Sequence, residues 1–126
     1  MRKSKINISG FKIGTAENRE GLTGVTVILA PDGGATAGVD VRGCAPGTRE
    51  TDLLDPRKTV QKIHAVVLSG GSAFGLEAAS GCVKYLAEQG VGFPIGNVCV
   101  PIVCLSLIHI SEPTRQEAIS YAVFCL

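Results

Sequence analysis

The chain has 126 residues, of which 45% are hydrophobic and 18% are charged, a composition typical of one globular domain and not of a disordered chain. Twelve Lys and Arg residues against eleven Asp and Glu residues leave a net charge of +1, so we expect no nucleic-acid partner and no basic membrane-binding surface. No apolar run approaches the roughly 20 residues of a membrane span. The basic start is not followed by an apolar region, so we expect no signal peptide.

The five cysteines are scattered along the chain and predict no metal site. None forms a Cys-x-x-Cys pair, and no group of His and Cys has zinc spacing. Free thiols suit a reducing compartment, so we expect a cytoplasmic protein. Each cysteine is expected to be a small buried hydrophobic residue and not a nucleophile (Cys44, Cys82, Cys99, Cys104 and Cys125).

The first part of the chain predicts three strands. Phe11–Gly14 is a short alternating run, and Gly24–Ala30 is a β-branched apolar run. Pro31–Gly34 is a strong turn signal, and Ala35–Val41 follows it. We therefore expect the last two strands to form a hairpin.

A long polar connection, Arg42–Asp55, comes next. Loops of this length are often functional, so its charges could surround a cavity. They could also pair with one another at the surface, where an ion pair contributes about 0–1 kcal/mol. Spacing alone favours the ion pairs. The charged residues in and beside this loop are Asp40, Arg42, Arg49, Glu50, Asp52 and Asp55.

The middle of the chain predicts a buried strand, Ile63–Leu68, followed by a helix over Ala73–Gln89. His64, inside the strand, is expected to be structural and not catalytic, and Gly90 is expected to be the C′ residue of the helix. The helix is apolar over a wide arc and needs cover on more than one side, which a layered α/β architecture provides.

Two further strand-forming segments, Val91–Gly96 and Val98–Val103, come after the helix.

The turn Ser69–Ser72 is the first candidate site. A glycine turn before a helix N-terminus presents free N–H groups to an oxyanion, a carboxylate or a phosphate, and Ser72 would be a good N-cap. The alternative interpretation is a tight turn and a cap without a ligand. Two sharper motifs are not met. The dinucleotide fingerprint has Ser72 where it needs its second glycine, and a nucleophile elbow would need glycine in place of Phe74.

Five motifs follow one another along the chain: Gly21–Val27, Gly38–Gly43, Ala45–Leu54, His64–Leu76 and Gly92–Gly96. Together they resemble the self-processing serine aminopeptidases, the family of D-aminopeptidase/D-esterase and the β-aminopeptidases. The similarity covers nearly all of the chain from residue 11 to residue 103. Two positions depart from the family pattern: Cys44, where a second glycine is expected, and Cys104, where a proline is expected.

This resemblance implies a partial, truncated αββα sandwich and a precursor that cleaves itself. Self-cleavage frees a serine at the N-terminus of a second chain, and that serine is the nucleophile. Such enzymes remove N-terminal residues from peptides, amides or esters through an acyl-enzyme, use no metal or organic cofactor, and assemble as homo-oligomers. The nucleophile is expected beyond this fragment, so the fragment has no catalytic residue and is expected to be inactive.

The resemblance implies that seven residues of this chain lie near the substrate pocket: Ser69, Gly70, Gly71, Ser72, Arg42, Arg49 and Glu50. Two other functions stay open. One is an anion- or nucleotide-binding module that uses the Gly70–Gly71 turn, against which the unmet fingerprint counts. The other is a related self-processing acyltransferase of the same architecture.

Leu105–Leu126 resembles a translated DNA-sequencing adapter. Leu105–Arg115 and Ile119–Leu126 match the two ends of such an adapter, and the three residues between them leave room for an index barcode. We therefore interpret residues 1–104 as the N-terminal fragment of a peptidase first chain. Residues 105–126 are interpreted as an adapter-encoded tail, outside the reasoning about the fold.

The adapter interpretation predicts what the source DNA holds beyond the codon for Val103. Adapter-free sequencing of that locus is expected to replace Leu105 onward with an unrelated continuation. Recovery of the same tail from independent genomic DNA would overturn the interpretation.

Overall fold

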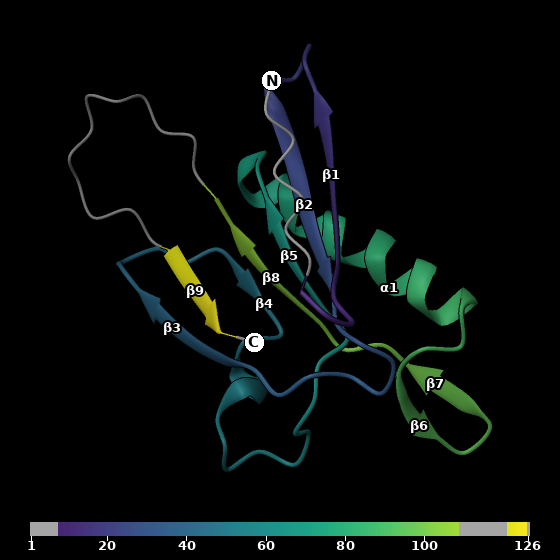
Figure 1. The fold of residues 1–126 in the computed structure, drawn as a ribbon. Coiled ribbons are helices and arrows are strands. Elements are labelled where there is room, and N and C mark those ends of the chain that lie inside the picture. Colours follow the sequence, from purple (N-terminus) through teal and green to yellow (C-terminus); the bar gives the residue numbers. More distant parts are fainter. Residues whose placement is uncertain (1–7, 109–120, 126) are drawn as a thin grey trace.

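The computed structural model describes residues 8–108 and 121–125, and these form a small mixed α/β domain (Figure 1). Its main layer is a five-stranded sheet in the order β1-β2-β5-β8-β4. The β5–β8 pair is parallel, and every other pair in this sheet is antiparallel. The strands are β1 (Lys12–Asn18), β2 (Thr23–Leu29), β5 (Ala65–Ser69), β8 (Val103–Leu107) and β4 (Thr48–Arg49). The expected layered α/β class is confirmed.

One α-helix, α1 (Ala78–Glu88), packs on one face of this sheet, behind the strands in Figure 1. Its C-terminus is the predicted one: Gly90 has φ +69° and its N–H donates to the Ala87 carbonyl at 3.0 Å. The Val91 N–H donates to the Leu86 carbonyl at 3.0 Å, which completes a Schellman motif. The prediction of Gly90 as the C′ residue is confirmed.

The start of the helix differs from the prediction. Residues Ser72–Glu77 form a 3₁₀ helix, η2, and α1 begins only at Ala78. Ser72 is not an N-cap, because its φ is +55° and an N-cap residue needs an extended backbone. No side-chain hydrogen bond caps either helix.

The predicted hairpin between Gly24–Ala30 and Ala35–Val41 is wrong. β2 pairs with β1 and β5, while β3 (Gly38–Arg42) joins β9 (Tyr121–Cys125) in a separate two-stranded sheet. Gly33 and Gly34 both have positive φ and turn the chain away from β2, after which Ala35 bridges to Ile63.

The segments after α1 form a second small sheet, β6 (Phe93–Ile95) with β7 (Val98–Val100). The single strand expected over Val98–Val103 is divided between β7 and β8. Pro101 lies at the break, where it has no N–H to donate to a strand ladder. The three-residue segment η1 (Asp52–Leu54) is a 3₁₀ helix inside the long polar connection.

Both faces of β5 are covered. Ala65 and Val67 pack with α1 on one face, and Val66 packs with Ile63 and Cys104 on the other. A strand buried on both faces reads as an uninterrupted apolar run, which explains why this segment could be predicted.

His64 has the structural role that was expected. It is buried, and its Nδ1 accepts a hydrogen bond from the Ile102 backbone N–H at 3.1 Å. Burial lowers the pKa of His64, so the neutral, accepting form is the one that fits this bond.

The cysteines divide into two pairs among the described residues. Cys82 and Cys104 are buried as predicted, and burial raises the pKa of Cys104 to about 12, which makes its thiol a poor nucleophile. Cys44 and Cys99 are exposed, so the prediction is wrong for them. Cys125 lies in β9, and its side chain is outside the described part of the structure.

The predicted boundary between the peptidase fragment (residues 1–104) and the adapter-encoded tail (residues 105–126) falls inside β8. Leu105, Ser106 and Leu107 are all buried, and each pairs with β5 in register. The origin of the segment after residue 104 stays a prediction. Its first three residues complete the core of this structure, so their removal is expected to cost stability.

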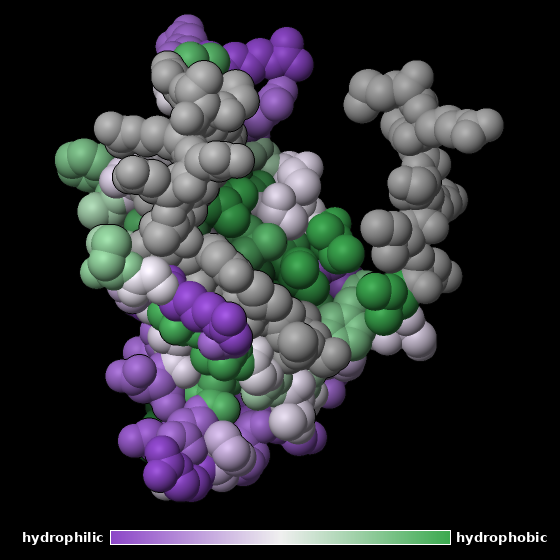
Figure 2. Space-filling model, turned by 90° about the vertical axis from the view of Figure 1, so that its left-hand side faces the viewer, coloured by the Kyte–Doolittle hydropathy of each residue, from purple (hydrophilic) through white to green (hydrophobic). Residues whose placement is uncertain are grey.

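The remaining surface carries hydrophobic side chains as well as polar ones. Figure 2 shows hydrophobic residues in the middle of one face, with hydrophilic residues gathered mainly towards the top and bottom. No helix among the described residues is long and apolar enough to cross a membrane.

The position of β8 predicts that Leu105→Ala lowers the free energy of unfolding by about 2–5 kcal/mol, because it leaves a cavity in a fully buried site. Val98→Ala, at a side chain that is 61% exposed, is the control and is expected to change it by less than about 0.5 kcal/mol. Urea denaturation measures both. Equal midpoints for the two variants would contradict the burial of β8.

Candidate functional site

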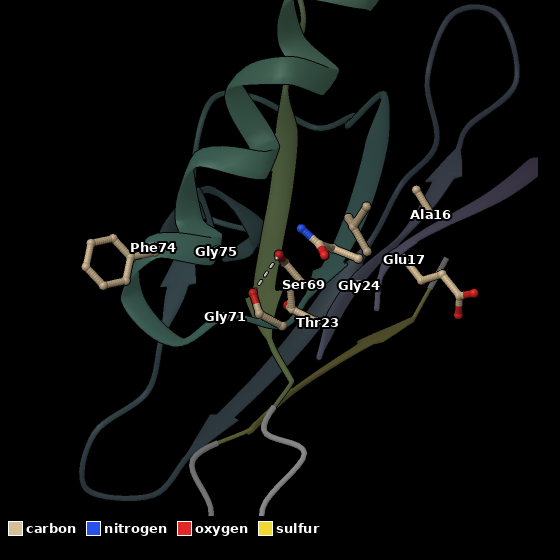
Figure 3. A pocket seen from close by; sticks show the side chains of 11 residues that line it. Ala16, Glu17, Thr23, Gly24, Ser69, Gly71, Phe74 and Gly75 are labelled. Atoms are coloured by element: carbon tan, nitrogen blue, oxygen red, sulfur yellow. Dashed lines mark hydrogen bonds between the residues drawn. The ribbon is translucent and has the colours of Figure 1, made fainter. Parts of the chain in front are cut away.

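A pocket of about 380 Å³ lies where β1, β2 and β5 meet the start of η2 (Figure 3). It contains three of the residues that the sequence singled out: Ser69, Gly70 and Gly71. The other lining residues are Ala16, Glu17, Asn18, Thr23, Gly24, Val25, Phe74 and Gly75. Most of this wall is apolar or has no side chain.

Hydrogen bonds hold the end of β5 in place. The Gly70 N–H donates to the Gly24 carbonyl at 2.9 Å, and the Ser69 carbonyl accepts from the Ile108 N–H at 2.7 Å. The Ser69 hydroxyl is buried and donates to the Gly70 carbonyl at 3.1 Å, the bond drawn in Figure 3. The strand end is therefore anchored on both sides.

The turn requires glycine where the backbones approach most closely. A side chain at Gly75 would overlap the Gly70 carbonyl oxygen and lie 2.9 Å from the Ser69 hydroxyl. A Cβ at Gly70 would lie 2.7 Å from the Thr23 hydroxyl. The first turn of η2 thus rests directly on the end of β5.

Two backbone N–H groups at this turn have no hydrogen-bond partner among the described residues. They belong to Gly71 and Ser72, whose φ values are +88° and +55°. The helical segment that follows them begins as the 3₁₀ helix η2 and continues without a gap as α1 from Ala78. What remains is a pair of adjacent donors in successive left-handed residues, one of which lines the pocket.

The other predicted site residues lie outside this pocket. Arg49 donates to the Ser80 hydroxyl at 2.7 Å and to the Leu76 carbonyl at 3.4 Å, so it ties the polar connection to the helices. Glu50, with φ +59°, accepts from the Cys104 thiol through its backbone carbonyl at 3.2 Å.

Ion pairing, the interpretation that spacing favoured for the charged loop, is confirmed for two of its residues. Arg42 pairs with Asp40 at 2.7 Å in an exposed position. A second exposed pair joins Asp55 to Arg57 at 2.6 Å, and the hydrogen bonds from Arg57 lower the pKa of Asp55 to about 2.

The ionisable residue that lines the pocket is Glu17, which pairs with Arg19 at 2.8 Å. Of the residues that the structure describes, no lysine or arginine lines it, which counts against the anion- or nucleotide-binding alternative. Among the described residues, no group of three His, Cys, Asp or Glu side chains is placed to hold a metal ion.

Sequence reasoning missed Glu17, Thr23 and Gly75 as parts of the site. Thr23 and Glu17 reach it through the antiparallel register of β1 with β2, in which Glu17 lies opposite Gly24. The motif Gly21–Val27 marked this segment, but gave no sign that it lies beside the Ser69–Ser72 turn.

The model of peptidase family S58 matches residues 5–118, and the chain belongs to this family. The family of serine aminopeptidases that the motifs resembled is therefore confirmed. The match extends into the segment interpreted as adapter-encoded.

Similar proteins carry the names of hydrolases. An uncharacterized aminopeptidase of Mycobacterium tuberculosis is 54% identical over 80 residues, which are 64% of this chain and 23% of that protein. A 6-aminohexanoate-oligomer endohydrolase of Paenarthrobacter ureafaciens is 39% identical over 85 residues, 68% of this chain and 21% of that protein. The chain thus spans about a quarter or less of the length of these relatives.

The contact between Gly75 and Gly70 predicts that Gly75→Ala lowers the free energy of unfolding by about 1–3 kcal/mol, because the methyl group forces the two backbones apart. Gly81→Ala is the control, since the added methyl group meets open space inside α1 and is expected to raise stability by about 0.5–1 kcal/mol. Urea midpoints that shift in the same direction for both variants would refute the close contact.

Proposed function

We propose that this chain is part of the first chain of a self-processing serine aminopeptidase, a hydrolase of peptides, amides or esters. Membership of peptidase family S58 over residues 5–118 is the observation that carries the proposal. The pocket beside Ser69, Gly70 and Gly71 supports it, because the family resemblance led us to expect these residues near the substrate.

In this proposal the turn holds the carbonyl oxygen of the substrate. The Gly71 and Ser72 N–H groups are unpartnered within the described chain and adjacent, as donors to a polarised carbonyl or an oxyanion must be. Donors fixed before the substrate arrives cost no reorganisation during the reaction, and Gly75 fixes these by closing the turn onto β5.

The nucleophile is proposed to lie outside this chain, at the new N-terminus that self-cleavage creates in a second chain. The apolar pocket wall fits an acyl group, and the names aminopeptidase and endohydrolase among the relatives favour a peptide or amide substrate. We further propose a homo-oligomeric, cytoplasmic parent enzyme that needs no cofactor. A related acyltransferase would share the pocket and differ in the group that accepts the acyl chain.

The proposal predicts that the 126-residue chain binds amides without hydrolysing them. Gly71→Ala is expected to weaken binding of hexanamide, because the methyl group stands beside the donors. Gly33→Ala is the matched control, since Gly33 has nearly the same φ, +90° against +88°, and lies outside the pocket.

Binding is measured by NMR titration of the folded variants, and hydrolysis by release of ammonia. Turnover by the chain alone would refute the missing nucleophile. Equal hexanamide affinity of the Gly71→Ala and Gly33→Ala variants would refute the role of the turn.

A further inference from the structure

A second hollow, of about 480 Å³, lies beside α1 on the face of the sheet that carries this helix. We call it the β1–β2 groove. Gly14 of β1 lies opposite Val27 of β2, and Lys12 lies opposite Leu29. Residues directly opposite each other share one face of a sheet, and Val27 and Leu29 pack against the core under α1. The helix contributes Ala78, Cys82 and Tyr85 to the groove.

The groove exists because one helix is too narrow to cover the whole sheet. α1 packs mainly on β5 and β8, while β1 and β2 form one side of the sheet. An α-helix with its side chains is about 10–12 Å across, and neighbouring strands are about 4.8 Å apart, so one helix covers about two strands. The strip over β1 and β2 thus has the width of one more helix.

This strip is apolar and open. Val27 and Leu29 are only partly buried, although they face the core side of the sheet. Tyr85 of α1 is 52% exposed. A Cβ added at Gly14 would meet open space, so nothing in the described part of the chain covers β1 at this point. A sheet face of this kind is stable when another element buries it.

We infer that the β1–β2 groove receives an amphipathic helix from another part of the same enzyme, with its apolar side packed on Val27, Leu29 and Tyr85. The inference rests on the proposed function, in which this chain is one part of a longer protein. The chain matches only 21–23% of the length of its relatives, so most of such a protein lies outside the matched segment and can supply the helix.

The geometry of the groove favours a helix over a strand as its occupant. A strand that joined this sheet would pair with the free edge of β1, in the plane of the sheet. The groove lies on the face of the sheet instead, where one wall is already a helix. Apolar grooves of this shape take the apolar side of an amphipathic helix.

A helix in the β1–β2 groove would also form part of the wall of the candidate substrate pocket. Val25 lines both hollows, and it lies opposite Ser69 at the end of β5. The docked helix therefore narrows the substrate pocket on its β2 side.

Maleimide labelling of a cysteine placed in the groove tests the inference. Gly14→Cys adds a thiol that meets open space, at a residue without positive φ. Gly81→Cys is the matched control, because a side chain there also meets open space but lies outside the groove. The probe is the rest of the Mycobacterium tuberculosis aminopeptidase, outside its matched 80 residues, expressed as a separate chain. Peptide mass spectrometry separates the added thiol from the native cysteines.

The probe is expected to bind the 126-residue chain and to slow the labelling of Gly14→Cys about tenfold or more, because a covered thiol is out of reach of the reagent. Labelling of Gly81→Cys is expected to stay unchanged. Binding without protection of Gly14→Cys would overturn the inference alone. Protection that appears without the probe and grows with the concentration of the chain would also overturn it, since the occupant would then be a second copy. Absence of binding, in the unmodified chain as well, would overturn the proposed function with it.

Discussion

β5 ends against the backbone of η2, at a contact between Gly70 and Gly75 that leaves no space for a side chain. The contact can form because β5 is held between β2 and β8 and buried on both faces, so its end has a fixed position. η2 then leaves the sheet through two left-handed residues, Gly71 and Ser72. The pocket follows from this arrangement, and so do the Gly71 and Ser72 N–H groups that have no partner within the described part of the chain.

The sequence suggested two roles for this turn: Ser72 as a helix N-cap and the backbone N–H groups as donors to a ligand. A serine after two glycines looks like the N-cap of a long helix, and a capping hydroxyl would satisfy the first N–H groups of that helix. In the structure Ser72 caps nothing, and the helix starts at Ala78. No capping hydroxyl therefore takes up the Gly71 and Ser72 N–H groups, and they have no partner among the described residues.

The sequence predicted correctly those elements whose structure depends on neighbouring residues. The apolar run at Ile63–Leu68 and the C-terminus of α1 at Gly90 were found because burial on two faces and a left-handed C′ residue leave clear marks in sequence. The hairpin after Gly24–Ala30 was wrong because strand pairing is decided by distant partners. Two glycines in a turn signal do not say which strand follows in the sheet.

The site shows the same division. The Ser69–Gly71 turn could be found from its own residues, whereas Glu17 enters the pocket only through the register of β1 with β2. Arg49 was expected at the substrate pocket, and its spacing could not reveal that it reaches Ser80 on α1. Charged residues in a long loop have too many possible partners for sequence to choose among them.

Hydrogen exchange of single amides, followed by NMR, tests the central claim most directly, because it separates amides that the structure satisfies from those it leaves free. The amides of Val66 and Val67 in β5 and of Gly70, which donates to Gly24, are predicted to exchange slowly. Those of Gly71 and Ser72 are predicted to exchange at nearly the rate of an unprotected chain, one residue away from the anchored strand. Protection of Gly71 and Ser72 equal to that of Gly70 would contradict the account.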